Sequence, residues 1–299
     1  MAKINNFKLR QMTLLKKRKN THMNYLYFKK YRILLLLIAA LSLLSLSSCN
    51  TANEGNNNQG DGNKNQGGDV KKIFDGVSDV EILEQSIKNL EKEENYFIEA
   101  TGKTKAKAFI TYTQNTKTLL YYMNGKFYNK IDSTSALVDH HHELLCQEDI
   151  IKYYDSSQKE VLTKTIAEYR SEFGKVPNKR DIFNYRMETD AIISSSRNFQ
   201  NDKYEITYNI DPEKIGDDLK IQMKAFGDLN ENPIFNAITL IIEVDEEGKL
   251  LKFKNIEKYS IVKNVLGKPV TMPCTQELES IVYYNNYQTP TKGEYFDFN

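Results

Sequence analysis

The densest group of metal-ligating side chains in the sequence lies between residues 139 and 146. Residues 139–143 read Asp-His-His-His-Glu, and Cys146 follows three positions later. Imidazole and thiolate groups are good zinc ligands, and four of them would close a structural site. Consecutive residues of a helix or strand point in different directions, so three adjacent histidines do not easily hold one ion. We favour no metal site; the candidate ligands are His140, His142 and Cys146, and the alternative is a solvated loop or helix start.

A hydrolytic role for the same stretch depends on its spacing. Residues 142–146 read His-Glu-Leu-Leu-Cys, which resembles the HExxH motif of zinc-dependent hydrolases. That resemblance implies a metal-dependent hydrolase using His140 to His142, but Cys146 stands where the motif has its second histidine. The sequence shows no nucleophile elbow and, in its folded part, no glycine loop for phosphate. We therefore predict a protein that is not an enzyme and has no catalytic residues.

Cys146 and Cys274 are the cysteines that follow Cys49. Outside the cytoplasm a disulfide between them is chemically allowed. Because the loop would be long, the chain-entropy account gives it about 4–5 kcal/mol of stabilisation. The sequence does not show whether the two side chains meet, so a pair of half-buried free thiols is the alternative.

Aromatic and aliphatic residues at strand spacing are the candidates for a binding surface. If a curved sheet encloses a ligand, five residues would line the cavity: Tyr121, Tyr204, Tyr208, Leu240 and Ile242. The alternative is that they are ordinary strand residues packed on the core or on the sheet surface.

The elements that would position these residues begin with a helix. Ser78 and Glu81 form a capping-box pattern, which predicts a helix over residues 79–94. Residues 96–101, 108–114 and 117–123 are rich in β-branched and aromatic side chains, which favours strands. Asn124-Gly125 is a strong hairpin signal between residues 117–123 and 126–131. We predict a helix followed by an antiparallel meander.

The middle of the chain, residues 137–200, favours helices in our interpretation. Apolar spacing predicts one over residues 148–154, and a capping box at residues 157–160 predicts a second that ends at Gly174. Residues 181–194 are a third candidate. Strand patterns then return at residues 204–210, 221–225, 238–244, 250–261 and 278–284, with a turn at residues 245–248.

This order of elements indicates an α+β fold with helices packed on one face of a curved antiparallel sheet. The order, over about residues 78–285, and the hairpin that begins ITLIIEV at residue 238 resemble the lipoprotein carrier fold typified by LolA and LppX. The resemblance implies a half-barrel closed by helices, with a lipid or lipid-linked molecule in its concavity.

A short apolar run precedes Cys49. Residues 33–46 contain no charged side chain, and basic residues come just before them. A helix of that length spans about 21 Å, short of the roughly 30 Å of a bilayer core, so the run is typical of a signal peptide. Residues 46–49, Leu-Ser-Ser-Cys, resemble a bacterial lipobox. That resemblance implies a diacylglyceryl group on Cys49, whose two acyl chains give stable anchoring; an uncleaved signal anchor is the alternative.

We divide the chain accordingly. Residues 1–49 are the signal peptide, with translation starting at Met23 as a hypothesis, because the ten residues from Met23 make a normal basic n-region. Residues 50–69 are a tether rich in Asn and Gly, about 25 Å long as a flexible chain. Residues 70–299 are a single domain.

The charge distribution excludes one class of partner. Ten of the 41 Lys and Arg residues precede Cys49 and none of the 40 Asp and Glu residues does, so the remainder carries 31 basic against 40 acidic groups. Nucleic-acid binding needs clustered basic residues, so we predict none. We expect a lipoprotein on the extracytoplasmic face of the cell membrane, with no cofactor besides the lipid on Cys49, that binds a hydrophobic or amphiphilic ligand. The alternative is a structural or protein-interaction module of the cell envelope with a packed core.

Overall fold

The computed structural model describes residues 74–108, 110–123, 125–136, 139–156, 159–174, 189–227, 229–265, 267–284 and 293–296. The predictions for the signal peptide, Met23, Cys49 and the tether lie outside these residues. No helix within the described ranges is both long and apolar enough to cross a membrane.

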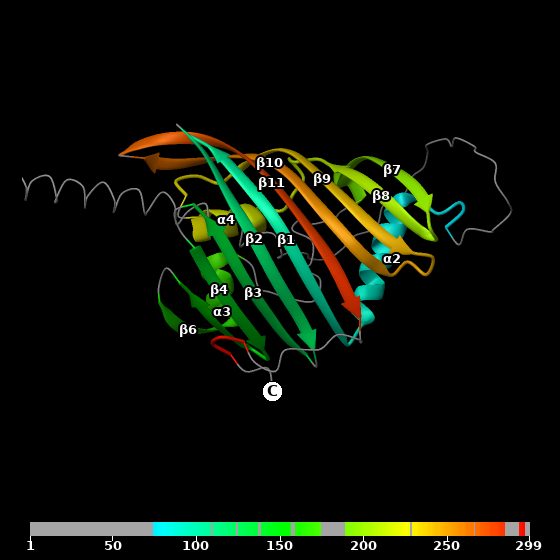
Figure 1. Cartoon of the computed structure of the whole chain (residues 1–299), viewed down its shortest axis with the longest axis horizontal. Helices are drawn as coiled ribbons and strands as arrows, with labels where there is room; N and C mark the ends of the chain where they lie inside the picture. Colours follow the sequence, from blue (N-terminus) through cyan, green and yellow to red (C-terminus); the bar gives the residue numbers. More distant parts are fainter. Residues whose placement is uncertain are drawn as a thin grey trace, which may run out of the picture.

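The described strands form one antiparallel sheet in which each half of the chain contributes a run of neighbours (Figure 1). The first half supplies β1 (Asn95–Lys107), β2 (Thr111–Met123), β3 (Lys126–Ser135), β4 (Asp139–Gln147), β5 (Ile150–Asp155) and β6 (Glu160–Thr165). The second half supplies β7 (Ile192–Gln200), β8 (Lys203–Ile210), β9 (Ile234–Asp245), β10 (Leu250–Val265) and β11 (Lys268–Tyr284).

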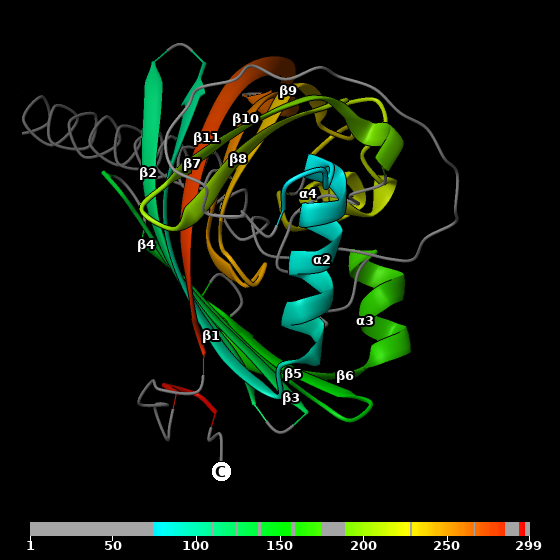
Figure 2. The ribbon, with the colours of Figure 1, turned by 90° about the vertical axis from the view of Figure 1, so that its right-hand side faces the viewer.

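Pairing of β1 with β11 joins the two halves into an eleven-stranded sheet. The strand order is β6-β5-β4-β3-β2-β1-β11-β10-β9-β8-β7, so β6 and β7 are the edges and the sheet is open. The β1–β11 register runs from Tyr96 opposite Tyr284 to Ala106 opposite Cys274. The sheet is strongly curved, and α2 (Asp79–Lys92), α3 (Ile166–Phe173) and α4 (Asp217–Gly227) lie inside the curve (Figure 2). We call this inner side, which carries Ile98 and Leu240, the concave face.

Helix α2 begins at the predicted capping box. The Ser78 hydroxyl accepts the Glu81 backbone N–H at 3.3 Å, and the Glu81 carboxylate accepts the Ser78 backbone N–H at 2.8 Å. The helix ends at Lys92, two residues earlier than predicted, because Glu93 is extended. It is fixed to the sheet at its first turn, where the Tyr208 hydroxyl donates to the Asp79 carbonyl at 2.6 Å and Arg197 pairs with the Asp79 carboxylate at 2.9 Å.

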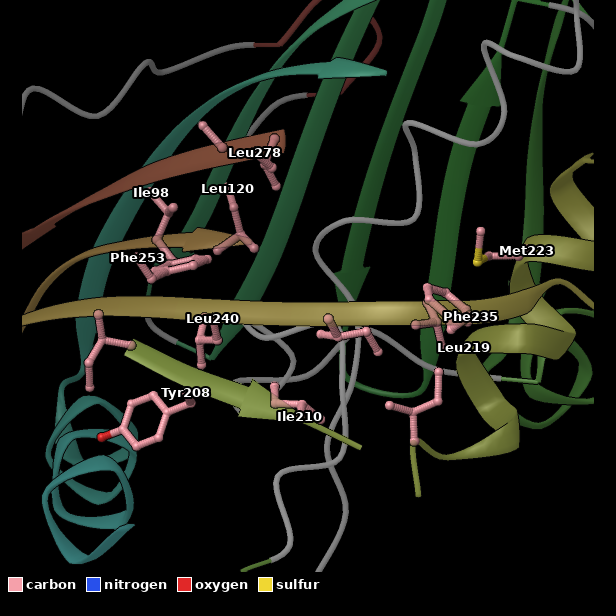
Figure 3. Close-up of a cluster of buried hydrophobic side chains, with 14 of the residues drawn as sticks. Ile98, Leu120, Tyr208, Ile210, Leu219, Met223, Phe235, Leu240, Phe253 and Leu278 are labelled. Carbon is pink, nitrogen blue, oxygen red and sulfur yellow. The ribbon is translucent and has the colours of Figure 1, made fainter. Parts of the chain in front are cut away.

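The main core lies between the concave face and the helices. Strand residues alternate, so that the even-numbered positions of β1 and β2 and the odd-numbered positions of the central part of β10 face inward. Figure 3 shows buried side chains of β1, β2 and β8 to β11 on this face, with Leu219 and Met223 of α4 near Phe235 of β9. Burial of this two-layer interior is the main apolar driving force for the fold.

One predicted helix is a strand, and the first part of another is also a strand. Residues 150–155 form β5, because Ile151 and Tyr153 are buried inward while Lys152 and Tyr154 face outward. Residues 160–165 form β6, paired along its length with β5. The predicted capping box at residues 157–160 is therefore wrong. The operative capping box is Thr165 with Glu168, and α3 ends at Gly174, as predicted, in the left-handed conformation (φ 74°).

The structure corrects three further expectations. Residues 221–225 belong to α4 rather than to a strand, because Leu219, Gln222 and Met223 are buried at helical spacing. Residues 181–188 lie outside the described ranges, and the rest of that predicted helix is a 3₁₀ turn (Thr189–Ala191) followed by β7. Residues 108–114 and 117–123 are not two strands; Thr111–Met123 forms the single strand β2. The hairpin at residues 123–126 is confirmed by Met123 paired with Lys126 and by Gly125 at φ 78°; Asn124 lies outside the described residues.

Candidate functional site

Four of the five residues predicted to line a ligand cavity lie together on the concave face. Tyr208 stands opposite Leu240, and Ile206 stands opposite Ile242, in the β8–β9 register. Tyr204 lies four residues before Tyr208 on the same face of β8. Tyr204, Tyr208, Leu240 and Ile242 are all buried in the main core.

Tyr121 is separated from those four residues. Its neighbours Leu120 and Tyr122 belong to the main core, whereas Tyr121 packs with Tyr128, Leu145 and Phe296 in a second cluster. Successive strand residues point to opposite faces of a sheet, so Tyr121 lies on the outer side, which we call the convex face. The expectation that Tyr121 shares a cavity with the other four is wrong.

The centre of the concave face is polar, which the sequence analysis missed. Eight buried polar residues on four adjacent strands make up this polar band: Thr104 of β1; Gln114, Thr116 and Thr118 of β2; Asn255 and Glu257 of β10; Gln276 and Ser280 of β11. In the register, one row runs Gln114, Thr104, Gln276, Glu257 across the four strands. The signal was present in the sequence as polar residues at the inward positions of otherwise apolar strand patterns.

Part of the polar band is satisfied within the chain. Thr104 donates to the Gln276 side-chain oxygen at 3.3 Å, and the Tyr259 hydroxyl donates to the same oxygen at 3.4 Å. Thr116 and Ser133 share a hydrogen bond at 3.3 Å. These contacts hold one side of the band in place.

Four other residues of the band have side-chain polar atoms without a hydrogen-bond partner among the described residues. Both polar atoms of the Asn255 amide, the hydroxyls of Ser280 and Thr118, and the Gln114 side-chain oxygen are buried without one. Asn255 and Ser280 are each 0% exposed. Leaving a buried polar group without a partner costs about 1–3 kcal/mol. A polar atom of a ligand or a water molecule would satisfy these groups.

The apolar surroundings of this group are extensive. Asn255 lies between Leu240 of β9 and Leu278 of β11, and Ser280 lies beside Phe253. Leu240, Leu278 and Phe253 are buried, as is Ile98 on β1 (Figure 3). The concave face therefore presents hydrogen-bonding groups within an apolar wall, which is the arrangement that matches an amphiphile.

The histidine cluster lies in strand β4, not in a loop or a helix start. His140 and His142 are buried on the concave side beside Asp155 of β5, at 3.4 Å and 3.7 Å from its carboxylate. His141 points to the convex face. Burial lowers the pKa of His142 despite the nearby Asp155 carboxylate, which favours the charged ring. The described residues contain no group of three or more His, Cys, Asp or Glu side chains arranged to hold a metal.

The two cysteines are free and buried, and they lie far apart. Cys146 is on β4 and Cys274 on β11, with three strands between them. Through the register, Cys146 is level with Tyr96 of β1, whereas Cys274 is level with Ala106. Four strand spacings are about 19 Å and ten residues along a strand are about 33 Å, while a disulfide needs Cα atoms within about 7 Å. The prediction of a disulfide between them is wrong.

A solvent-open depression of about 550 Å³ lies between β6 and α3. Its lining includes Leu162, Lys164 and Glu172 and none of the predicted site residues. Lys164 pairs with Glu172 there, so its charged groups already have partners. We place no function in it.

The class of fold is an open, curved antiparallel sheet with helices inside the curve. No protein-family model matches the sequence, and no curated protein matches it significantly. Among solved structures, a LolA superfamily protein from Nitrosomonas europaea is 10% identical, with a TM-score of 0.25, and the match covers 71% of this chain and 96% of that one.

Two further solved structures are similar at the same level. A domain named for outer membrane lipoprotein sorting, from Vibrio parahaemolyticus, is 13% identical with a TM-score of 0.27, covering 70% of this chain and 93% of that one. The ywiB protein of Bacillus subtilis is 10% identical with a TM-score of 0.21, covering 62% and 93%. The Nitrosomonas europaea protein carries the name LolA, one of the two names that typify the fold resembled by the element order. Because these three TM-scores are low, the function proposed next is derived from this chain's own side chains.

Proposed function

We propose that this chain is a non-catalytic binding protein, anchored by a lipid on Cys49 to the extracytoplasmic face of the membrane, that takes up an amphiphilic ligand against its concave face. The observation that carries the proposal is the set of buried, unpartnered polar groups at Asn255, Ser280 and Thr118. A ligand headgroup with donors and acceptors satisfies these groups. Its hydrocarbon part contacts the apolar residues around them.

The ligand class follows from the balance of the two surfaces. A purely apolar ligand would leave the polar groups unsatisfied, at about 1–3 kcal/mol each. A small polar ligand would not match the apolar surroundings that Phe253, Leu240 and Leu278 give to these polar groups. A molecule with both a hydrogen-bonding headgroup and an acyl or similar chain matches both surfaces. Ligand sites commonly combine an apolar lining with a few placed polar groups in this way.

The test is organic-solvent extraction of the purified full chain followed by mass spectrometry of the released molecules. Extraction leaves the covalent lipid on Cys49 in place, so only bound ligand is counted. The wild-type chain is expected to release a stoichiometric amphiphile. The double variant Asn255→Leu with Ser280→Ala is expected to release at least tenfold less. The matched control, Asn264→Leu with Thr275→Ala, changes exposed positions of the same two strands and should behave as wild type. Release of no amphiphile by the wild type, or equal release by the double variant, counts against the proposal.

A second candidate function is an interaction module of the cell envelope. It is favoured by the convex face, where Ile281 and Tyr283 of β11 are 40% and 37% exposed and Tyr283 continues a row of stacked aromatic rings. This function needs a packed interior and a partner on the outer face. A protein that releases no ligand and yet binds a separate chain through Tyr283 would have this second function.

A further inference from the structure

The convex face carries a row of aromatic side chains that cross four strands. In the register, Tyr283 of β11 lies opposite Phe97 of β1, Phe97 opposite Tyr121 of β2, and Tyr121 opposite Tyr128 of β3. The ring centroids of Phe97 are 5.4 Å from those of Tyr283 and 4.4 Å from those of Tyr121, with both pairs stacked. Leu145 of β4 continues the row.

A buried carboxylate lies beside the end of this row at β3 and β4. Glu143 of β4 is 0% exposed, although it is on the convex face. It accepts a hydrogen bond from the Tyr128 hydroxyl, and the His141 ring nitrogen Nε2 is 3.5 Å from it. The other His141 nitrogen is 2.6 Å from the Asp132 carboxylate. Together these four side chains form a compact polar centre.

Residues 293–296, from the end of the chain, occupy this site. The Tyr295 backbone N–H donates to Glu143 at 3.0 Å. The Tyr295 ring stacks on Tyr154 of β5, with centroids 3.6 Å apart and planes at 12°. Phe296 is buried against Tyr121, Tyr128 and Leu145. Figure 2 shows this segment outside the curve of the sheet, on the side opposite the helices.

The fit requires glycine at one position. A Cβ atom on Gly293 would lie 1.8 Å from a Glu143 carboxylate oxygen and 2.6 Å from the Tyr128 hydroxyl. The Gly293 N–H donates to the Phe296 carbonyl at 2.7 Å, which closes the segment into a turn. The Glu294 side chain is 57% exposed and comes only to 3.8 Å from His141. The sheet thus contacts the Tyr295 backbone N–H, the Cα of Gly293 and the rings of Tyr295 and Phe296. It makes little contact with the side chain of Glu294, the residue after the glycine.

We propose that the convex face is a peptide-binding site for a Gly-x-aromatic-aromatic segment, and that residues 293–296 of the same chain occupy it as an intramolecular competitor. Each contact is made by the segment itself, so a separate peptide of the same pattern makes the same contacts when the resident segment leaves. The site lies on the opposite side of the sheet from the amphiphile site and does not depend on it.

The experiment measures binding of a fluorescein-labelled peptide with the sequence of residues 293–299, GEYFDFN, to the folded full chain by fluorescence anisotropy. In the wild type the resident segment competes, so weak binding is expected. Gly293→Ala in the chain removes the competitor by the clash with Glu143, and the peptide is expected to bind at least tenfold more tightly. Glu294→Ala is the matched control, because that side chain is exposed; it should bind the peptide as the wild type does.

Two further measurements fix the interpretation. A peptide with alanine in place of its glycine should not bind the Gly293→Ala chain, and adding Tyr154→Ala to that chain should lower the affinity for the original peptide by about 30-fold, the size of an aromatic hot spot. Tyr295→Ala is a second way to release the segment if Gly293→Ala misfolds. A dimer of the Gly293→Ala chain with the wild-type chain would place residues 293–296 of the wild type in the empty site of the variant. Such a dimer would support the proposal and would identify a second copy of this chain as the ligand. Equal peptide binding by wild type and both folded release variants, or none by either variant, would overturn it.

Discussion

Replacing Asn255 by leucine should make the ligand-free protein more stable. The Asn255 amide is fully buried on β10, and neither its nitrogen nor its oxygen has a hydrogen-bond partner among the described residues. Its register neighbours are Leu240 and Leu278, so leucine enters a surface that is already apolar and has nearly the same size.

The size of the effect follows from the two unpartnered groups. Each buried donor or acceptor without a partner costs about 1–3 kcal/mol. Removing both, with some loss to imperfect packing of the new side chain, should raise the free energy of unfolding by about 2 kcal/mol. In a domain of this size about 1 kcal/mol shifts Tm by 2–4 °C, so Tm should rise by about 4–8 °C.

The assay is urea denaturation of the solvent-extracted full chain, followed by circular dichroism. The matched control is Gln276→Leu, in the same polar band, where the side-chain oxygen accepts from Thr104 and Tyr259. That substitution should lower the free energy of unfolding by about 1–3 kcal/mol, because it leaves two buried hydroxyls without an acceptor. If Asn255→Leu destabilises the ligand-free chain as Gln276→Leu does, the amide has partners within the chain, and our reasoning about the concave site fails.

Three other outcomes are expected. Ser78→Ala should destabilise the chain by about 1 kcal/mol through loss of the α2 cap, measured by urea denaturation; no loss would mean that Tyr208 and Arg197 alone hold this end of α2. Cys49→Ser should abolish incorporation of labelled palmitate and release the chain from membranes, and retained label would refute the lipobox. On the convex face, burial alone would lower the pKa of His141, but the hydrogen bonds of His141 to Glu143 and Asp132 outweigh burial and raise that pKa. Burial alone would raise the pKa of Glu143, but the hydrogen bonds of Glu143 to His141 and Tyr128 outweigh burial and lower that pKa. The stability from His141 is complete below its ordinary pKa of 6.5 and is lost as pH rises through the raised value, while that from Glu143 is complete above 4.5 and is lost as pH falls through the lowered value. The difference in unfolding free energy between wild type and His141→Gln should therefore be largest between about pH 4.5 and 6.5, and a difference that does not change with pH would contradict this assignment.

Local signals in the sequence predicted the elements whose contacts are local. The capping box at Ser78, the hairpin at residues 123–126 and the stop at Gly174 each depend on residues within one turn, and each is confirmed. The strands β8 and β9 also follow from alternation, since one of their faces is buried and the other faces outward.

The sequence could not distinguish helix from strand where both faces of a strand carry apolar residues. In β5, Tyr153 packs inward, while Tyr154 packs outward against Tyr295. Apolar residues on both faces remove the period of two that identifies a strand, and Ile151 with Tyr154 then matches a helical spacing. The same cause placed Tyr121 on the wrong face, because residues 119–122 read Leu-Leu-Tyr-Tyr and the outer cluster is as apolar as the core.

The candidate sites were still less visible, because their partners are distant in sequence. Glu143 and Tyr295 are 152 positions apart and meet only once β4 and the end of the chain are in place. In strand β4, alternation places His140 and His142 on the concave face and His141 with Glu143 on the convex face. The three neighbouring histidines therefore belong to two separate polar centres.

This division by strand alternation also makes the two proposals independent of each other. Asn255 points inward from β10, and Glu143 points outward from β4, five strands away in the sheet order. Substitutions that are more than about 10 Å apart and share no partner usually act additively. Asn255→Leu should therefore change amphiphile binding without changing peptide binding, and Gly293→Ala should do the reverse. If either substitution altered both, the curved sheet would couple its two faces, and ligand uptake inside would then control what the outer face can bind.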